Sequence, residues 1–105
     1  MRVSYSPRSC RDFQNIRDFI VAESKDRQAA DLYLRRLLDA CDSLASLPER
    51  FPIYRYAKEW RMMPFDNYLV FFRIHADTVQ IGHVRHCARM PFRESGRKES
   101  GTSRA

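Results

Sequence analysis

The fold is decided by residues 61–89, which read Arg61-Met-Met-Pro-Phe-Asp-Asn-Tyr-Leu-Val-Phe-Phe-Arg73 and, after five further residues, Val79-Gln-Ile-Gly-His-Val-Arg-His-Cys-Ala-Arg89. Apolar residues alternate along residues 68–75, and several intervening residues are also apolar, which is typical of a central strand. Asp66-Asn67 predicts the turn before this strand, and Ala76-Asp77 predicts a tight connection to a second strand at residues 78–86. Basic and histidine side chains therefore accompany a pair of apolar strands.

Gly82 lies inside the second of these strands, and a glycine at such a place indicates a β-bulge.

Before residue 66, a further short strand is predicted around Trp60 and Met62, whose side chains share one face. We expect Trp60 and Phe72 to belong to the core. Residues 49–58 predict the loop that leads into this strand.

Two amphipathic helices precede the loop. Ser6 is a good N-cap and Pro7 suits the first helical position, so a helix is expected from Pro7 to about residue 23. After a short polar joint at residues 24–26, a second helix is expected to run to about Leu47, before Pro48. The joint is so short that the helices should form an antiparallel hairpin. The expected core stripes are Phe13, Ile16, Phe19 and Ile20 on the first helix, and Ala30, Tyr33, Leu34, Leu37, Cys41, Leu44 and Ala45 on the second.

With a short β-like segment at residues 2–5, the element order becomes β-α-α-β-β-β, an α+β fold. A chain of 105 residues is expected to form one domain, which we place at residues 1–92. Residues 93–105 lack apolar anchors and predict a flexible basic tail.

The charge of the chain is uneven. Residues 1–49 hold eight Lys or Arg and eight Asp or Glu, whereas residues 50–105 hold eleven against five, so the net charge of +6 lies in the second half. Such a surface favours an acidic partner, either nucleic acid or ribosome, or an acidic protein segment that wraps the domain. Sixteen of the nineteen cations are Arg, which makes bidentate contacts to phosphate and carboxylate.

Several classes of protein are disfavoured. No apolar run is long enough to span a bilayer, and residues 1–5 do not resemble a secretory signal, so a cytoplasmic location is expected. Cys10, Cys41 and Cys87 are odd in number and far apart, which predicts free thiols. His83, His86 and Cys87 are metal-ligand types, but successive strand residues point to opposite faces and no fourth ligand is evident. We expect no metal and no cofactor.

The helix hairpin followed by one particular residue pattern resembles the RelE/ParE superfamily of bacterial toxins from type II toxin-antitoxin modules. The likeness covers about residues 3–90 and is strongest in Arg-x-x-Pro-x-x-x-Tyr-x-x-x-Phe-Arg and in the ending His86-Cys-Ala-Arg89, which is similar to the His-Gly-Ala-Arg of ParE-like members. The pattern consists of Arg61, Pro64, Tyr68, Phe72, Arg73, Val84, His86 and Arg89.

This resemblance implies an antiparallel sheet packed on the helix hairpin. It also implies a cognate antitoxin that wraps the toxin, in a toxin-antitoxin hetero-oligomer, and growth inhibition when the toxin is released. ParE-like members are taken to poison DNA gyrase, whereas RelE-like members cut messenger RNA on the ribosome. The long hairpin and the His-x-Ala-Arg ending favour the ParE-like, non-catalytic reading, and Phe92 stands where RNA-cutting members carry a proton-transfer group.

The candidate site residues follow from these two readings. A ribonuclease needs a proton-transfer group flanked by cations, for which the resemblance suggests Arg61, His86 and Arg89. Each also has a structural interpretation: Arg61 as a solvated strand residue, Arg73 as a polar residue at a strand end, and either histidine as a partner of local backbone groups. The residues expected to bind the target or the antitoxin are Arg61, Arg73, His83, Arg85 and Arg89.

Overall fold

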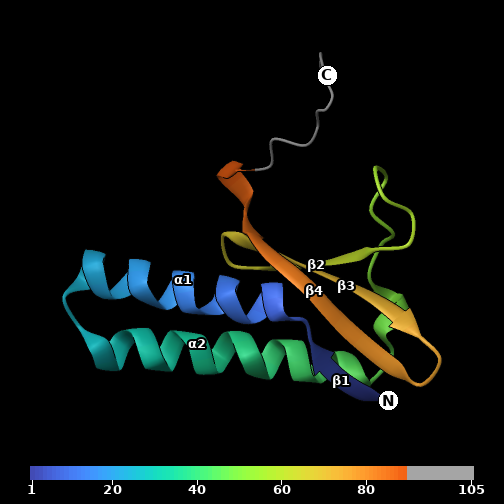
Figure 1. Ribbon diagram of the computed structural model, residues 1–105, viewed down its shortest axis with the longest axis horizontal. Helices are drawn as coiled ribbons and strands as arrows, with labels where there is room; N and C mark the ends of the chain where they lie inside the picture. The colour runs from blue at the N-terminus through green and yellow to red at the C-terminus, as the bar shows by residue number, and fades with distance from the viewer. Residues whose placement is uncertain (90–105) are drawn as a thin grey trace, which may run out of the picture.

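Two helices pack on one face of a four-stranded sheet in the computed structural model (Figure 1), which describes residues 1–89. The predicted order β-α-α-β-β-β and the α+β class are confirmed. The domain boundary at residue 92 and the tail at 93–105 lie outside the described residues. Neither helix of this part of the chain is long and apolar enough to cross a membrane. The elements are β1 (Arg2–Tyr5), α1 (Pro7–Ser24), α2 (Arg27–Asp42), β2 (Arg61–Phe65), β3 (Tyr68–His75) and β4 (Thr78–His86).

The strand order in the sheet is β1-β4-β3-β2. β2, β3 and β4 form an antiparallel meander with two-residue connections at 66–67 and 76–77, as the turn residues predict. β1, however, pairs with β4 in parallel, so the sheet is mixed and the expectation of a wholly antiparallel sheet is corrected. A tight turn would force antiparallel pairing, whereas β1 and β4 are joined through the helices and two other strands.

The helices begin where their caps predict. The Ser6 hydroxyl accepts a hydrogen bond from the Ser9 amide at 3.0 Å, and the Asp26 carboxylate accepts one from the Ala29 amide at 3.1 Å. The prediction that the second helix reaches Leu47 is wrong, because α2 ends at Asp42 and continues only as a 3₁₀ turn at Ser43–Ala45. The Ser43 hydroxyl donates to the Ala40 carbonyl, which competes with continued helical bonding.

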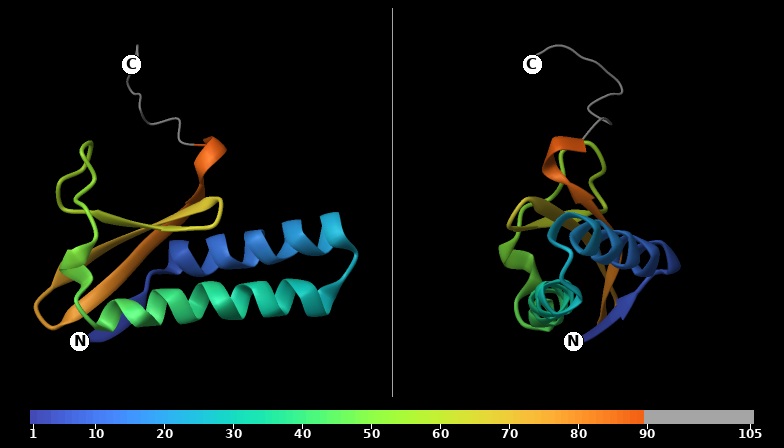
Figure 2. Two further views of the ribbon diagram at one scale, coloured as in Figure 1. Left: turned by 180° about the vertical axis from the view of Figure 1, so that it is seen from behind. Right: turned by 90° about the vertical axis from the view of Figure 1, so that its left-hand side faces the viewer.

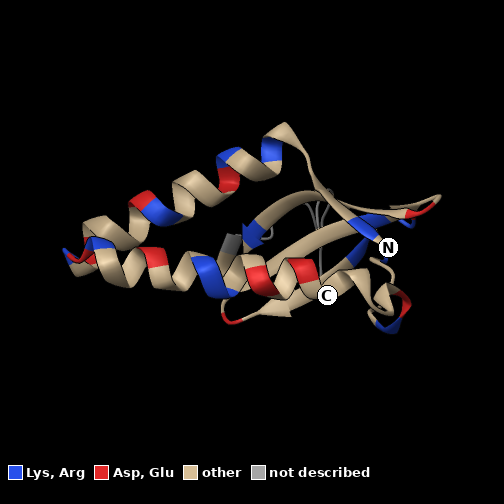
Figure 3. Ribbon diagram, turned by 90° about the horizontal axis from the view of Figure 1, so that it is seen from below, with Lys and Arg blue, Asp and Glu red and all other residues tan. Residues whose placement is uncertain are grey.

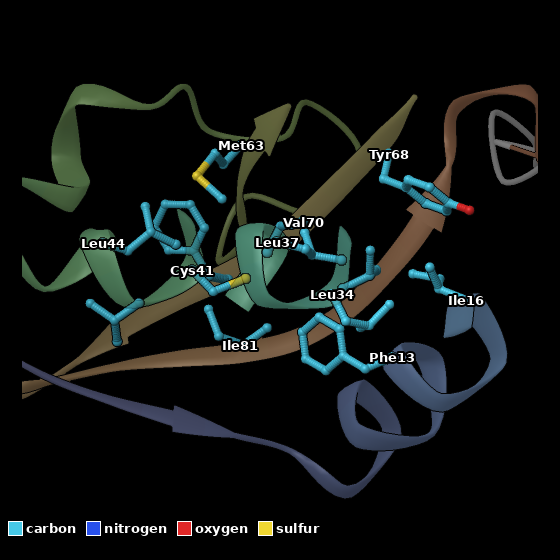
Figure 4. Close-up of a cluster of buried hydrophobic side chains, with 13 residues drawn as sticks. Phe13, Ile16, Leu34, Leu37, Cys41, Leu44, Met63, Tyr68, Val70 and Ile81 are labelled. Carbon is cyan, nitrogen blue, oxygen red and sulfur yellow. The ribbon is translucent and has the colours of Figure 1, made fainter. Parts of the chain in front are cut away.

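The core fills the space between the helices and the inner face of the sheet (Figure 4). Cys41 and Phe72 are fully buried there, as predicted. Phe19 is 50 % exposed although it continues the apolar stripe of α1. The reason is visible in Figure 2, where the connected ends of the two helices project beyond the sheet. Core residues include Phe13, Ile16, Leu34, Leu37, Leu44, Met63, Tyr68, Val70, Val79, Ile81 and Val84.

Gly82 forms the predicted bulge. Phe71 pairs with His83 and Phe72 with Ile81, so Gly82 is the extra residue of β4. The Ser6 hydroxyl donates to the Gly82 carbonyl at 2.6 Å. On the face of the sheet away from the helices, a Cβ atom at position 82 would overlap Cη2 and Cζ3 of Trp60. The bulge thus links the start of α1 to the face of the sheet opposite the helices, here called the outer face.

Replacing Gly82 by Ala is expected to destabilise the fold by about 1–3 kcal/mol, because the new methyl group must displace the Trp60 ring. Urea unfolding followed by circular dichroism measures this change. In a Trp60→Leu background the same substitution should cost less, since the ring that it displaces is absent. An equal cost in both backgrounds would contradict the steric explanation.

Candidate functional site

A cluster of rings covers the outer face of the sheet. Phe71 is only 1 % exposed although it points away from the helices, and Tyr54, from the loop before β2, covers it with ring centroids 5.0 Å apart. His83 stacks on the other side of Phe71, with centroids 4.6 Å apart and an interplanar angle of 20°. Trp60 and Tyr56 meet His83 and Tyr54 edge to face. We call Tyr54, Tyr56, Trp60, Phe71 and His83 the outer cluster.

The outer cluster encloses a pocket of about 380 Å³. Two cations from different elements complete its wall: Arg8 from the first turn of α1 and Arg85 from β4. Among residues 1–89, those that line the pocket include no carboxylate; they are Arg8, Tyr54, Tyr56, Ala57, Trp60, Phe71, His83 and Arg85. The outer pocket therefore joins flat apolar walls to concentrated positive charge.

His83 is neutral in this environment. Burial, followed by the positive charges of Arg8 and Arg85, lowers the pKa of His83 to about 4. An uncharged imidazole stacks on Phe71 without the cost of burying a third cation between two arginines. His83 therefore contributes an uncharged aromatic surface to the outer pocket, and Arg8 and Arg85 contribute positive charge.

Arg73 has a structural role beside the same pocket. Its guanidinium lies 4.8 Å above the centre of the Trp60 ring, donates to Gln80 at 2.8 Å and forms an ion pair with Glu59 at 3.3 Å. These contacts hold the loop before β2 against the sheet. Arg73 therefore supports one wall of the pocket, in agreement with its interpretation as a structural residue.

Arg61 also holds the chain in place. Its guanidinium donates to the Phe51 carbonyl at 2.7 Å and to the Glu49 carbonyl at 3.2 Å, and so it ties β2 to the loop that leads into it. Because these acceptors are backbone oxygens, the arginine satisfies polar groups that the loop would otherwise leave without partners.

His86 lies on the opposite face of β4 from His83 and lines a second groove, of about 340 Å³, between α1 and β4. Its Nδ1 accepts a hydrogen bond from the Ala88 amide at 3.0 Å, and its ring meets Tyr68 edge to face. Arg89 ends the 3₁₀ turn at Cys87–Arg89 that follows β4.

The candidate ribonuclease residues are not gathered at one point. Arg61 is opposite Phe72 and His86 is opposite Tyr68, so β3 lies between them and the two pairs are four residues apart along it. At roughly 3.3 Å per residue and 4.8 Å per strand, the two backbones are about 16 Å apart. Of the five candidate binding residues, the structure brings His83 and Arg85 together, with Arg73 at the edge.

Sequence reasoning missed part of this site. Trp60 is half-buried on the outer face and does not belong to the core, which corrects our expectation. Arg8 is 77 positions before Arg85 in the chain, and the start of α1, which Ser6 ties to the bulge, brings it to the same pocket. The available signal was the spacing of Tyr54, Tyr56 and Trp60 among the cations of one loop.

The excess positive charge of the described chain lies outside the helices. Each helix carries three basic and three acidic residues, which are interspersed along it (Figure 3). Across the hairpin, Arg17 pairs with Asp31 at 2.8 Å. Residues 50–89 hold seven basic residues against three acidic ones. Within residues 1–89, no group of three or more His, Cys, Asp or Glu could hold a metal ion.

The sequence was compared with models of known protein families. The family model described as "ParE toxin of type II toxin-antitoxin system, parDE" matches residues 3–91. The chain belongs to the ParE toxin family. The predicted superfamily and the ParE-like assignment are thereby confirmed, and the chain is a ParE-family toxin of a type II toxin-antitoxin system.

The fold agrees with that of a solved toxin-antitoxin structure. A chain from the chromosomal ParDE TA system of P. aeruginosa superposes with a TM-score of 0.71 at 14 % identity, covering 82 % of this ParE toxin and 95 % of that chain. YafQ from E. coli strain BL21(DE3) matches with a TM-score of 0.46 at 15 % identity, over 84 % of this chain and 96 % of its own. No relative was found among the curated proteins.

The stability of this ParE toxin should fall as the pH drops from about 6.5 to about 4. His83 takes up a proton near pH 6.5 when unfolded but only near pH 4 when folded, so its contribution is complete above 6.5 and is lost across this window. Because the ring is partly exposed, we expect a loss of about 1–2 kcal/mol. Urea unfolding at several pH values measures it.

The variant His83→Phe keeps a stacked ring without a titratable group, so its stability should change less across the same window. The exposed histidine His75, changed to Gln, is the matched control and should retain the wild-type pH dependence. Equal slopes for wild type and His83→Phe would show that His83 does not cause the effect.

Proposed function

We propose that this ParE-family toxin acts in the cytoplasm by inhibiting DNA gyrase without catalysis, and that a cognate antitoxin neutralises it. Family membership supports a toxin that is paired with an antitoxin. The distance of about 16 Å between the backbones of Arg61 and His86 supports the non-catalytic mechanism. The positive surface formed after residue 50 suits both gyrase-bound DNA and an acidic antitoxin segment.

The alternative, ribosome-dependent cleavage of messenger RNA, has less support. It requires a proton-transfer group and cations around one phosphate. Arg61 instead binds two backbone carbonyls, and the Nδ1 of His86 accepts a backbone hydrogen bond. His83, the other histidine near cations, has its pKa lowered to about 4 and stacks on Phe71. Arg61, His86 and His83 thus make contacts that stabilise the fold, which favours a mechanism by binding over one by catalysis.

Induction of the chain from a tightly repressed promoter in bacteria is expected to arrest growth, with intact messenger RNA and gyrase-linked DNA breaks. The purified protein should also inhibit supercoiling of relaxed plasmid by gyrase. The variant His86→Gln removes the proton-transfer group on which the ribonuclease mechanism relies, and it should remain toxic.

Mapping of RNA 5′ ends during the arrest separates the two mechanisms. If new RNA 5′ ends appear at ribosome-occupied codons and the variant His86→Gln abolishes them, the gyrase proposal is wrong. Coexpression of the adjacent antitoxin gene should restore growth in either case, so this control verifies that the arrest comes from the toxin.

A further inference from the structure

The outer pocket has the features of a recognition site that the proposed inhibition of gyrase does not itself require. It is a hollow of about 380 Å³ whose walls are the rings of Tyr54, Tyr56, Trp60, Phe71 and His83. Small-ligand and side-chain sites generally measure some 300–1,000 Å³, with mostly apolar walls and a few polar groups that orient the guest. A single aromatic side chain and its neighbours fit the lower end of that range.

We infer that the outer pocket anchors an acidic peptide segment, whose aromatic side chain inserts among the rings while an adjacent carboxylate pairs with Arg8 and Arg85. The inference rests on the proposed function in one respect, namely that the cognate antitoxin is the protein that carries this segment. The chemistry of the pocket defines the segment: one phenyl-type ring flanked by Asp or Glu.

The positive charge of the pocket points to a carboxylate. Arg8 and Arg85 come from α1 and β4, yet both are close enough to His83 to lower its pKa. Arginine binds carboxylate in a bidentate manner, and a partly buried pocket strengthens that attraction. Because His83 is neutral, the positive charge among the described lining residues comes from the two guanidinium groups.

The rings favour an aromatic guest. Tyr54, Phe71 and His83 already form one stacked and edge-to-face array, with centroid distances of 5.0 and 4.6 Å. A further ring continues such an array with the same offset or edge-on geometry. Tyr56 is 55 % exposed at the rim, so a guest would bury apolar surface that the free protein leaves in water.

A single strand of nucleic acid fits less well. Such strands bind along grooves where a row of cations follows successive phosphates. On the outer face the guanidinium groups of Arg55 and Arg73 lie over the rings of Tyr56 and Trp60, and Arg73 is also paired with Glu59. The charge is therefore concentrated at one point, which suits a peptide anchor.

Trp60 supplies a direct test, because it is the only tryptophan of the chain and forms part of the pocket wall. Full-length protein made by cell-free synthesis is titrated with acetyl-Asp-Glu-Phe-Asp-Glu-amide, and Trp60 fluorescence is recorded. We expect a saturable change. Peptides with Ala in place of Phe, or with Asn and Gln in place of the acids, should bind about tenfold or more weakly.

Variants locate the binding. Arg8→Gln and Arg85→Gln should each weaken the acidic peptide about tenfold, whereas the exposed Arg36→Gln on α2 removes the same charge elsewhere and should leave affinity unchanged. If Arg85→Gln fails to fold by circular dichroism, Tyr56→Ala at the exposed rim takes its place and should also weaken binding. Added salt should weaken the acidic peptide more than the amide peptide.

Three results would overturn the inference: no saturable change in Trp60 fluorescence, equal effects of Arg8→Gln and Arg36→Gln, or tighter binding of a ten-residue oligothymidylate than of the acidic peptide. Gyrase and bacterial growth do not enter this experiment. A failure here would therefore leave inhibition of gyrase standing, and a failure of gyrase inhibition would leave the peptide site standing.

Discussion

Gly82 fixes both the start of α1 and the position of Trp60 on the outer face of the sheet. On the side of β4 that faces β1, Ser6 binds the Gly82 carbonyl with its hydroxyl and the Ile81 carbonyl with its amide. On the outer side, the Trp60 ring occupies the space that any side chain at position 82 would need. Asp12 of α1 then accepts a hydrogen bond from the Val84 amide at 2.9 Å, beyond the point where β1 ends. The direction of α1 and the position of the loop before β2 therefore both depend on a residue without a side chain.

Much of this architecture could be predicted from local chemistry. Ser6 and Asp26 cap helices because their side chains accept from the first free amides, and the two-residue turns follow from the residues present. The end of α2 could not be predicted from its apolar stripe, because a 3₁₀ turn keeps Leu44 buried just as a helix would. The parallel pairing of β1 with β4 could not be predicted either, because the relative direction of two strands depends on the path of the whole chain between them.

The candidate site shows why residue type alone is a weak guide to function. Arg61, Arg73 and Arg85 have the same side chain, yet Arg61 binds loop carbonyls, Arg73 covers Trp60 and Arg85 lines a pocket. They differ in strand and in register, and the bulge at Gly82 sets the face on which Arg85, the one arginine of the three that follows it, lies. Arg8 belongs to the site only because α1 begins beside that bulge. The charge count of the second half predicted a basic surface, but it could not distinguish the cations that hold loops from those that line the outer pocket.

The parallel pairing of β1 with β4 also has a consequence for the time order of folding. Residues 2–5 have no strand to pair with until residues 78–81 have been synthesised. Contacts between such distant parts of a chain form slowly, because a long loop must be closed before they are gained. His83 and Arg85 follow directly after that pairing, so the outer pocket is among the last features to be completed. A nascent chain of this toxin would therefore carry its helix hairpin well before the outer pocket is complete, because the pocket also needs His83 and Arg85 of β4.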